Sequence, residues 1–333
     1  MSLSPSGFLV QHRPLRIGTR ASALALWQTE RVRARLADCG YRTGRVEIRT
    51  TGDLVQDVPL SRSGDRALFT KQLDEAMLDG RIDVAVHSLK DLPTRLPDGI
   101  ALGAVGLRED PRDALVARGG LRWATLPEGA SVATRSLRRR AQLLWRRPDL
   151  QVVDIRGNVD TRLAKLDQTE AWSAILLATA GLVRLGLDAR ISERLALDVM
   201  LPAPGQGALA ATARADDDHA LEALRRALHE PAVELAVTAE RAFLRTLEGG
   251  CQVPIAAVAH LADEGGGRTL RLRGRVVSLG GEQCADGTLA TASLSADSAD
   301  ALGTTLAHEL LREGADAILR GVRAERAEPV AEP

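Results

Sequence analysis

The stretch IDVAVHSLKDLP, residues 82–93, decides how the fold of this chain is interpreted. Apolar side chains alternate between Ile82 and Val86, which is typical of a strand. Three polar residues follow this strand directly: Ser88, Lys90 and Asp91. A buried strand that ends in polar side chains is the arrangement in which open α/β sheets bind their ligands. The stretch therefore predicts both a central strand and a ligand site at its carboxyl end.

Segments with strand spacing and helix spacing take turns upstream of this stretch. Leu15–Gly18 is a short apolar strand, and the helix that follows is capped by Ser22 and ended by Gly40. Residues 46–50 alternate as a strand, and residues 69–77 have helical spacing. This alternation predicts an α/β fold with a mainly parallel, doubly wound sheet.

A second alternating series follows a charged, proline-containing break at Arg108–Asp113. Strands are expected at 131–134, 151–155 and 174–178. Helices are expected after Ser136, from the segment 156–162 through Leu166, and around Arg184. A second break at 202–207 precedes an apolar segment at 208–214, which we expect to return to the first sheet. The first domain is then discontinuous.

The last third of the chain has a different pattern. A helix is expected from Pro231 to Gly249, and strands are expected near 255–261, 269–279 and 288–294. A further helix is expected from Ser298, its possible cap, to Arg312. Together these elements indicate a small α+β unit. The expected divisions are an N-terminal tail (1–14), a first α/β lobe (15–107 and 206–228), a second α/β lobe (112–202), the α+β domain (230–323) and a C-terminal tail (324–333), which is too polar to pack.

Composition excludes several classes of function. Acidic and basic residues balance at 44 each and only 2% of residues are aromatic, so nucleic acid is not an expected partner. We find no nucleotide-binding glycine motif and no metal-ligand spacing. No apolar run is long enough to span a membrane, and residues 1–14 lack a signal core. The three widely spaced cysteines fit a reducing cytoplasm.

Arginine recurs at predicted strand ends and helix starts. These positions are Arg20, Arg138, Arg139, Arg156, Arg162 and, less clearly, Arg135 and Arg184. Guanidinium groups bind carboxylates bidentately, and helix N-termini add free N–H groups. Any single arginine is better explained as part of a solvated face. The repetition at one kind of position favours a site for a multiply anionic ligand.

Two residues remain ambiguous on residue chemistry alone. Asp91 next to Lys90 is either a structural ion pair or a carboxylate that stabilises a developing cation. Cys251, which follows Gly249 and Gly250, is either a small buried side chain or a thiol on a tight turn that carries an adduct. His87 is expected to be packed.

The order of several motifs resembles the porphobilinogen deaminase (hydroxymethylbilane synthase) family. The resemblance runs from about Leu15 into the C-terminal domain. Its motifs are RIGTRAS (16–22), AVHSLKDLP (85–93), the charged stretch 108–113, SLRR (136–139), the segment 156–162, GQGA (205–208) and LEGGCQVP (247–254).

This resemblance implies a fold, a reaction and a cofactor. The fold is two lobes similar to type II periplasmic binding proteins and a third domain that carries a dipyrromethane cofactor linked to Cys251. The reaction joins four porphobilinogen molecules, releases ammonia and yields hydroxymethylbilane for tetrapyrrole and heme biosynthesis. The resemblance also implies a cytoplasmic monomer whose product passes to uroporphyrinogen-III synthase.

Site residues are carried over by position. Asp91 is implied as the catalytic residue, and the implied cofactor ligands are Ser88, Lys90, Thr134, Ser136, Arg138 and Arg139. The implied substrate ligands are Arg20, Ser22, Gln28, Arg62, Arg156, Arg162 and Arg184. Arg62, the segment 64–67 and Arg135 depart from the pattern of the family, in a probable lid loop and beside the cofactor site.

Two other functions compete with this interpretation. Two lobes around an arginine-lined cleft also describe a non-catalytic dicarboxylate receptor, which has no use for Cys251 or Asp91 and needs export. The altered lid motivates the third possibility, an intact scaffold with impaired turnover. A mass measurement and a turnover assay separate the three.

Overall fold

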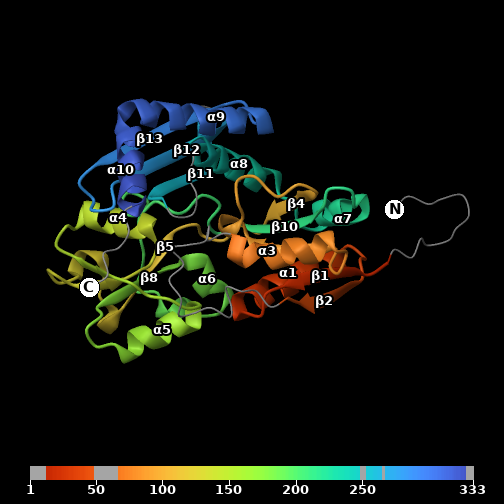
Figure 1. Cartoon of the computed structure of the whole chain (residues 1–333), viewed down its shortest axis with the longest axis horizontal. Helices are drawn as coiled ribbons and strands as arrows, with labels where there is room; N and C mark the ends of the chain where they lie inside the picture. Colours follow the sequence, from red (N-terminus) through yellow and green to blue (C-terminus); the bar gives the residue numbers. More distant parts are fainter. Residues whose placement is uncertain (1–12, 49–66, 248–252, 265–266, 328–333) are drawn as a thin grey trace, which may run out of the picture.

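The computed structural model describes residues 13–48, 67–247, 253–264 and 267–327. Three sheets, each with its own helices and hydrophobic core, make up this part of the chain. Figure 1 shows two α/β lobes beside each other and the C-terminal unit packed along one side of both. The α/β class, with two doubly wound lobes and a small α+β domain, is confirmed.

The first lobe is built on a sheet with strand order β2-β1-β3-β10-β4. β1, β2 and β3 are parallel, whereas β10 runs antiparallel to both of its neighbours. The apolar segment after the second break therefore returns to the first sheet, as the sequence predicts. The elements of this lobe are β1 (Leu15–Thr19), α1 (Ala23–Asp38), β2 (Thr43–Glu47), α3 (Ala67–Leu78), β3 (Val84–Ser88), β4 (Ile100–Gly106), β10 (Leu209–Arg214) and α7 (Asp218–Leu228).

The second lobe repeats this plan with strand order β7-β6-β8-β5-β9, in which β5 is the antiparallel strand. Ser136 caps α4, because its hydroxyl accepts a hydrogen bond from the Arg139 N–H at 3.5 Å. The elements are β5 (Asp113–Ala117), β6 (Ser131–Ala133), α4 (Leu137–Arg146), β7 (Gln151–Val153), α5 (Val159–Gln168), β8 (Ala174–Ala178), α6 (Thr179–Arg184) and β9 (Glu193–Arg194).

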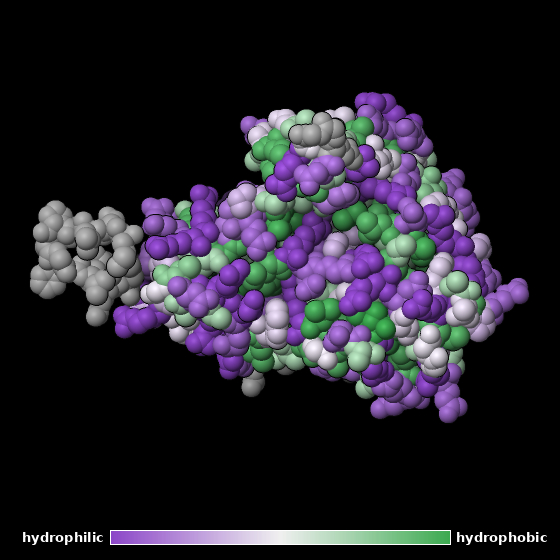
Figure 2. All heavy atoms as spheres, turned by 180° about the vertical axis from the view of Figure 1, so that it is seen from behind, coloured by the Kyte–Doolittle hydropathy of each residue, from purple (hydrophilic) through white to green (hydrophobic). Residues whose placement is uncertain are grey.

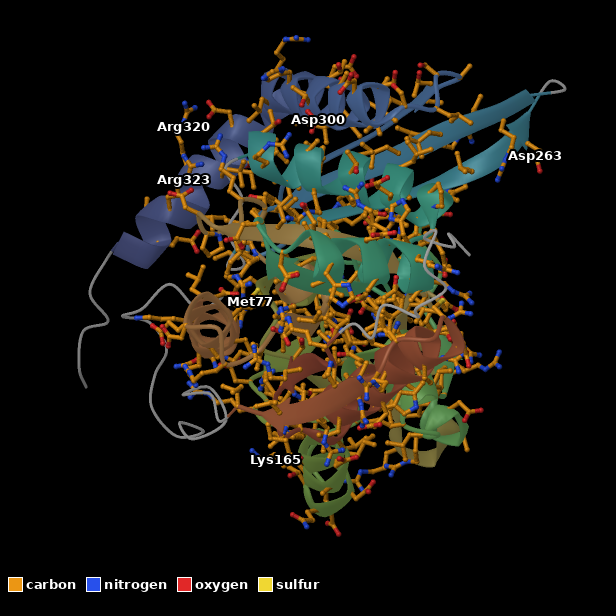
Figure 3. The ribbon with its side chains drawn as sticks, turned by 90° about the vertical axis from the view of Figure 1, so that its right-hand side faces the viewer. Met77, Lys165, Asp263, Asp300, Arg320 and Arg323 are labelled. Atoms are coloured by element: carbon orange, nitrogen blue, oxygen red, sulfur yellow. The ribbon has the colours of Figure 1, made fainter. Side chains whose placement is uncertain are left out.

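The C-terminal unit is an antiparallel sheet, β11-β12-β13, with helices on one face. Phe243 of α8 is fully buried and packs on Gly274 of β12, where any added Cβ would lie 2.4 Å from the ring. Figure 3 shows the β11–β12 hairpin projecting from the body, with Asp263 near its tip. The elements are α8 (Pro231–Thr246), β11 (Ile255–Glu264), β12 (Gly267–Val277), β13 (Cys284–Thr291), α9 (Ala296–Leu310) and α10 (Asp316–Ala327).

Several element boundaries differ from the sequence expectation. β13 begins at Cys284, four residues before the expected start, because its pairing with β12 and not its own alternation fixes its length. The cap of α9 is Ser295, whose hydroxyl accepts from the Ser298 N–H, so Ser298 lies inside the first turn. α10 was not expected, and it continues into the predicted polar tail.

Two chain crossovers connect the lobes. In the first, Leu107 has a left-handed backbone (φ 48°), and Arg108 pairs with the fully buried Glu240 of α8 at 2.8 Å. In the second, Gly207 (φ +88°) lies so close to Glu109 that an added Cβ would be 2.2 Å from its carbonyl oxygen. The domain boundaries given from the sequence stay a prediction.

The described surface is mixed in character. Hydrophilic and apolar side chains are interspersed over the face seen in Figure 2. None of the helices within the described residues is long and apolar enough to cross a bilayer.

A tight contact between α8 and α9 in the C-terminal unit gives a stability prediction. A Cβ at Gly303 of α9 would lie 2.2 Å from the Ala239 carbonyl oxygen of α8. We expect Gly303→Ala to lower the free energy of unfolding by about 1–3 kcal/mol through overpacking. Denaturant unfolding measures it. The control is Gly321→Ala in α10, where nothing lies within 4 Å and helix propensity predicts no loss. Equal stability of the two variants would contradict this packing.

Candidate active site

A cavity of about 250 Å³ lies between the two lobes. This volume suits a small ligand and not a macromolecule. Nine of the residues singled out from the sequence line it: Arg20, Ser22, Gln28, Ser88, Lys90, Asp91, Arg139, Arg162 and Arg184. In the first lobe they come from the ends of β1 and β3 and from α1, and in the second lobe from α4, α5 and α6. The fold thus joins side chains that are far apart in the sequence.

The wall from the first lobe is formed where β1 and β3 end. Ser22 caps α1 by accepting a hydrogen bond from the Ala25 N–H at 3.3 Å, which orients the first turn of the helix. One turn later, the Gln28 amide donates to the Ser88 hydroxyl at 2.8 Å. This bond fixes the end of β3 against α1. His87 is buried on the same strand, 3.2 Å from the Thr212 hydroxyl, so it is packed as expected.

Lys90 and Asp91 lie in a short 3₁₀ turn directly after β3 (Leu89–Asp91). The half-buried Lys90 ammonium donates to the Gln206 side-chain oxygen at 3.1 Å. Burial lowers the pKa of Lys90 from 10.5 to about 8, because the cost of burying the charge exceeds the attraction of Asp91, which acts in the opposite direction. The Asp91 side chain is exposed and faces the cavity. A cation and a carboxylate therefore share this end of the site.

Asp113, at the start of β5, holds the site's cationic groups together. Burial alone would raise the pKa of the Asp113 carboxyl, but the charges of Arg138 and Arg139 hold this pKa well below its usual range. The carboxylate accepts from Arg138 at 2.7 Å, from Arg139 at 2.7 Å and from the Gln206 amide at 2.9 Å. Sequence reasoning missed this residue. The only sign of its role in the sequence is that an acidic residue stands at the start of an apolar run. A carboxylate in such a position is costly to bury unless cations accompany it.

Arg162 and Arg184 form the opposite wall. Arg162 donates to the Gly157 carbonyl at 2.7 Å, and Gly157 has a left-handed backbone (φ +115°) that turns this carbonyl toward the helix. Arg184 donates to the carbonyls of Leu107 and Gly207 in the two crossovers, at 3.0 and 2.6 Å. Burial lowers the pKa of each guanidinium to about 10, so both remain charged at neutral pH.

Other expected site residues lie beside the cavity and not on its wall. Arg138 is buried and bound to Asp113 and the Leu201 carbonyl. The Thr134 hydroxyl accepts from the Ser136 N–H at 3.2 Å, and Ser136 caps α4. Arg156 is half-buried at the end of the segment that enters α5. Cys251 and Arg62 lie outside the described residues.

The cavity is cationic. Five cations line it, Arg20, Lys90, Arg139, Arg162 and Arg184, against two carboxylates, Asp91 and Asp160. Arg162 and Arg184 donate to carbonyls, which carry no charge, and among the residues that the structure describes neither forms an ion pair with a carboxylate. Such a donor set fits a ligand with several carboxylates.

Family models match most of the chain. Residues 15–222 match "Porphobilinogen deaminase, dipyromethane cofactor binding domain", and residues 234–312 match "Porphobilinogen deaminase, C-terminal domain". The chain belongs to the porphobilinogen deaminase family. As a member of this family it is a transferase of tetrapyrrole biosynthesis with a dipyrromethane cofactor domain. The cation-rich cavity, which lies within the matched residues, fits such a polycarboxylate group.

The names of similar proteins agree with this family. The chain is 51% identical over 307 residues to a porphobilinogen deaminase of Syntrophotalea carbinolica, covering 92% of this chain and 95% of the relative. It is 52% identical over 307 residues to that of Rubrobacter xylanophilus, with 92% and 97% covered. Among solved structures, a second substrate-binding domain of a putative amino acid ABC transporter from Streptococcus pneumoniae has a TM-score of 0.43 at 10% identity, covering 65% of this chain and 91% of that one.

The lowered pKa of Lys90 can be tested in this protein because the sequence has only three lysines. In cofactor-free protein, competitive acetylation followed by peptide mass spectrometry should give Lys90 a midpoint near pH 8. The controls are Lys71 and the exposed Lys165 of α5, seen at the edge of the molecule in Figure 3. The folded protein releases this proton before the unfolded chain does, so stability should rise with pH from about 8 to 10.5. Three equal midpoints would contradict the burial argument.

Proposed function

We propose that this protein joins four porphobilinogen molecules head to tail onto a dipyrromethane linked to Cys251, and then releases hydroxymethylbilane. The observation that carries this proposal is the cavity between the lobes, which is lined by the Asp91 side chain and by arginines from both lobes. Porphobilinogen carries an acetate and a propionate, so every ring added to the growing chain brings two more negative charges. A cationic wall on both lobes is the arrangement that this product needs.

The arginines bind and orient carboxylates in this proposal. Arg20 and Ser22 present donors from the first lobe, and Arg162 and Arg184 present donors from the second. A ligand that binds the donors of both lobes is fixed in orientation. The two reactants then meet within one complex and not by an encounter in solution. Lys90 and Arg139 are assigned to the cofactor carboxylates, because both are joined through Gln206 and Asp113 on one side of the cavity.

Asp91 is assigned to the reacting centre. The aminomethyl group of porphobilinogen loses ammonia when its C–N bond breaks toward nitrogen, and the pyrrole becomes an azafulvenium cation. A carboxylate about 4 Å from this charge contributes roughly 4 kcal/mol near a protein surface, or about three orders of magnitude in rate. The same carboxylate accepts the pyrrole N–H. Lys90, the residue before Asp91, donates to Gln206, and Asp91 lines the cavity.

The dipyrromethane, when bound, supplies the nucleophilic pyrrole carbon that forms the new bond. This chain's residues hold the partners and remove the proton that the new bond displaces. Asp91 is the carboxylate placed for that proton, since the second acid of the wall, Asp160, lies on α5 of the other lobe.

Three finer assignments rest on the resemblance to the family. We infer a cytoplasmic location, a monomeric state and delivery of the product to uroporphyrinogen-III synthase. Light scattering tests the monomer. The alternative of an intact scaffold with impaired turnover, motivated by Arg62 and residues 64–67, is decided by a turnover assay.

Intact mass tests the attachment of the cofactor. We expect the purified protein to exceed its sequence mass by one dipyrromethane and to react with Ehrlich's reagent, because the thioether to Cys251 persists through turnover. Cys251→Ser should lose both properties. Cys284→Ser, which changes a half-buried free thiol of β13, should keep both. Full activity at the unmodified mass would overturn the tether.

Replacement of Asp91 tests its role in the chemistry. We expect Asp91→Asn to retain the cofactor mass while kcat falls by about 1,000-fold, the loss predicted for one carboxylate at the developing cation. Asp98→Asn, at an exposed position that does not line the cavity, should leave kcat within twofold. Steady-state kinetics provides the measurement. Normal turnover of Asp91→Asn would remove Asp91 from the mechanism.

A further inference from the structure

A buried arginine from the C-terminal sheet reaches into the second lobe. Arg275 of β12 is fully buried and forms an ion pair with Asp286 of the neighbouring strand β13. Its Nη1 donates across the domain boundary to the Gln142 side-chain oxygen of α4 at 2.9 Å. Burying a guanidinium is costly, and a charge that only held β12 to β13 would not need to be covered by another domain.

The contact surface around Arg275 is closely packed. The guanidinium lies over the Trp145 ring of α4, 4.6 Å from its centroid, and Arg146 lies 4.0 Å from the same centroid. At the β12–β13 turn, a Cβ on Gly281 would lie 2.4 Å from the Trp145 backbone nitrogen. Figure 1 shows α4 at this boundary between the second lobe and the C-terminal unit. α4 therefore cannot shift along β12 without breaking these contacts.

Gln142 joins this contact to the second crossover. Its oxygen also accepts from the Leu201 N–H at 2.9 Å, and its amide donates to the carbonyls of Leu201 at 3.0 Å and Arg138 at 3.3 Å. All four hydrogen-bonding positions of this buried side chain are therefore used. Because Gln142 is buried and all of its hydrogen-bonding positions are used, its side chain is held in a single orientation.

From Gln142 the hydrogen bonds continue to the cavity. Arg138 donates to the Leu201 carbonyl at 2.6 Å and to Asp113 at 2.7 Å. Asp113 also accepts from Arg139 and from Gln206, and Gln206 accepts from Lys90. An unbroken series of polar contacts thus connects a buried residue of the C-terminal domain with both proposed cofactor cations of the cavity.

We propose that Arg275 is a positioning residue, which acts through Gln142 to hold the start of α4 in register with the C-terminal domain. The proposal rests on the proposed function, in which the cofactor is anchored at Cys251 in the C-terminal domain and gripped by Arg139 and Lys90. Arg275 and Gln142 form a buried polar link from β12 to α4, which holds the described part of the C-terminal domain against the helix that carries Arg139.

The test compares Arg275→Met with Arg273→Met in the full-length protein. Arg273 lies two residues away on the same strand and pairs with Asp198 and Asp286, but not with Gln142. For Arg275→Met we expect amide hydrogen exchange in residues 134–146 to rise about tenfold. We also expect kcat to fall about tenfold, with KM for porphobilinogen changed by less than twofold, because the substrate arginines are untouched. Arg273→Met should change neither kcat nor this exchange.

Two further variants keep the test decisive if Arg275→Met does not fold. Arg275→Lys retains the charge but cannot bond Asp286 and Gln142 in one fork, so it should show a smaller effect of the same kind. Gln142→Glu retains both acceptors but loses the donors to Leu201 and Arg138, and should reproduce the loss in kcat. In a double variant that combines Arg275→Met with Gln142→Glu, the two losses in kcat should not add.

The outcomes separate the two proposals. A lower melting temperature with unchanged exchange in residues 134–146 and unchanged kcat would make Arg275 purely structural and overturn this inference. A wild-type protein without cofactor mass or turnover would instead overturn the proposed function, while the hydrogen exchange still decides whether Arg275 holds α4.

Discussion

The buried carboxylate of Asp113 is the interaction on which the site depends. It lies where the chain enters the second lobe, and it binds two buried guanidinium groups of α4 and the side chain of Gln206 from the other crossover. Removing one partner of a buried pair of this kind typically costs about 3–5 kcal/mol, because a charge remains without compensation. The start of α4, both crossovers and, through Gln206, the Lys90 ammonium are therefore fixed by one side chain.

The cations of the site differ in how they are compensated. Arg138 and Arg139 share the single carboxylate of Asp113, which leaves a net positive charge on this pair. Arg162 and Arg184 contact neutral carbonyls, and Lys90 contacts a neutral amide. Burial lowers the pKa of each of these last three groups, as it also does for Arg138. A carboxylate ligand would reverse this shift, which is the electrostatic reason that the cavity favours polyanions.

The placement of the site at the crossovers has a consequence for motion. Arg184 contacts both crossovers, Gln206 lies in one of them, and Glu240 of the C-terminal domain accepts hydrogen bonds from Arg108 and the Gly205 N–H. Any change in the angle between the lobes must therefore alter the cavity itself. A growing polycarboxylate chain that contacts both lobes is coupled to that angle by the same groups.

The alternation of strands and helices in the sequence determined the α/β class, since side-chain period is a local property. The break at 202–207 suggested that the next strand returns to the first sheet, and the pairing of β10 with β3 and β4 decided it. The same reasoning could not find Asp113, Gln142 or Arg275, because the contacts that define their roles, Asp113–Arg138 and Gln142–Arg275, join residues that are 25 and 133 positions apart along the chain. Position in the sequence identified which arginines gather at strand ends. Only the tertiary structure decided which of them are neutralised inside the protein, because a buried charge takes its role from the partner that folding brings to it.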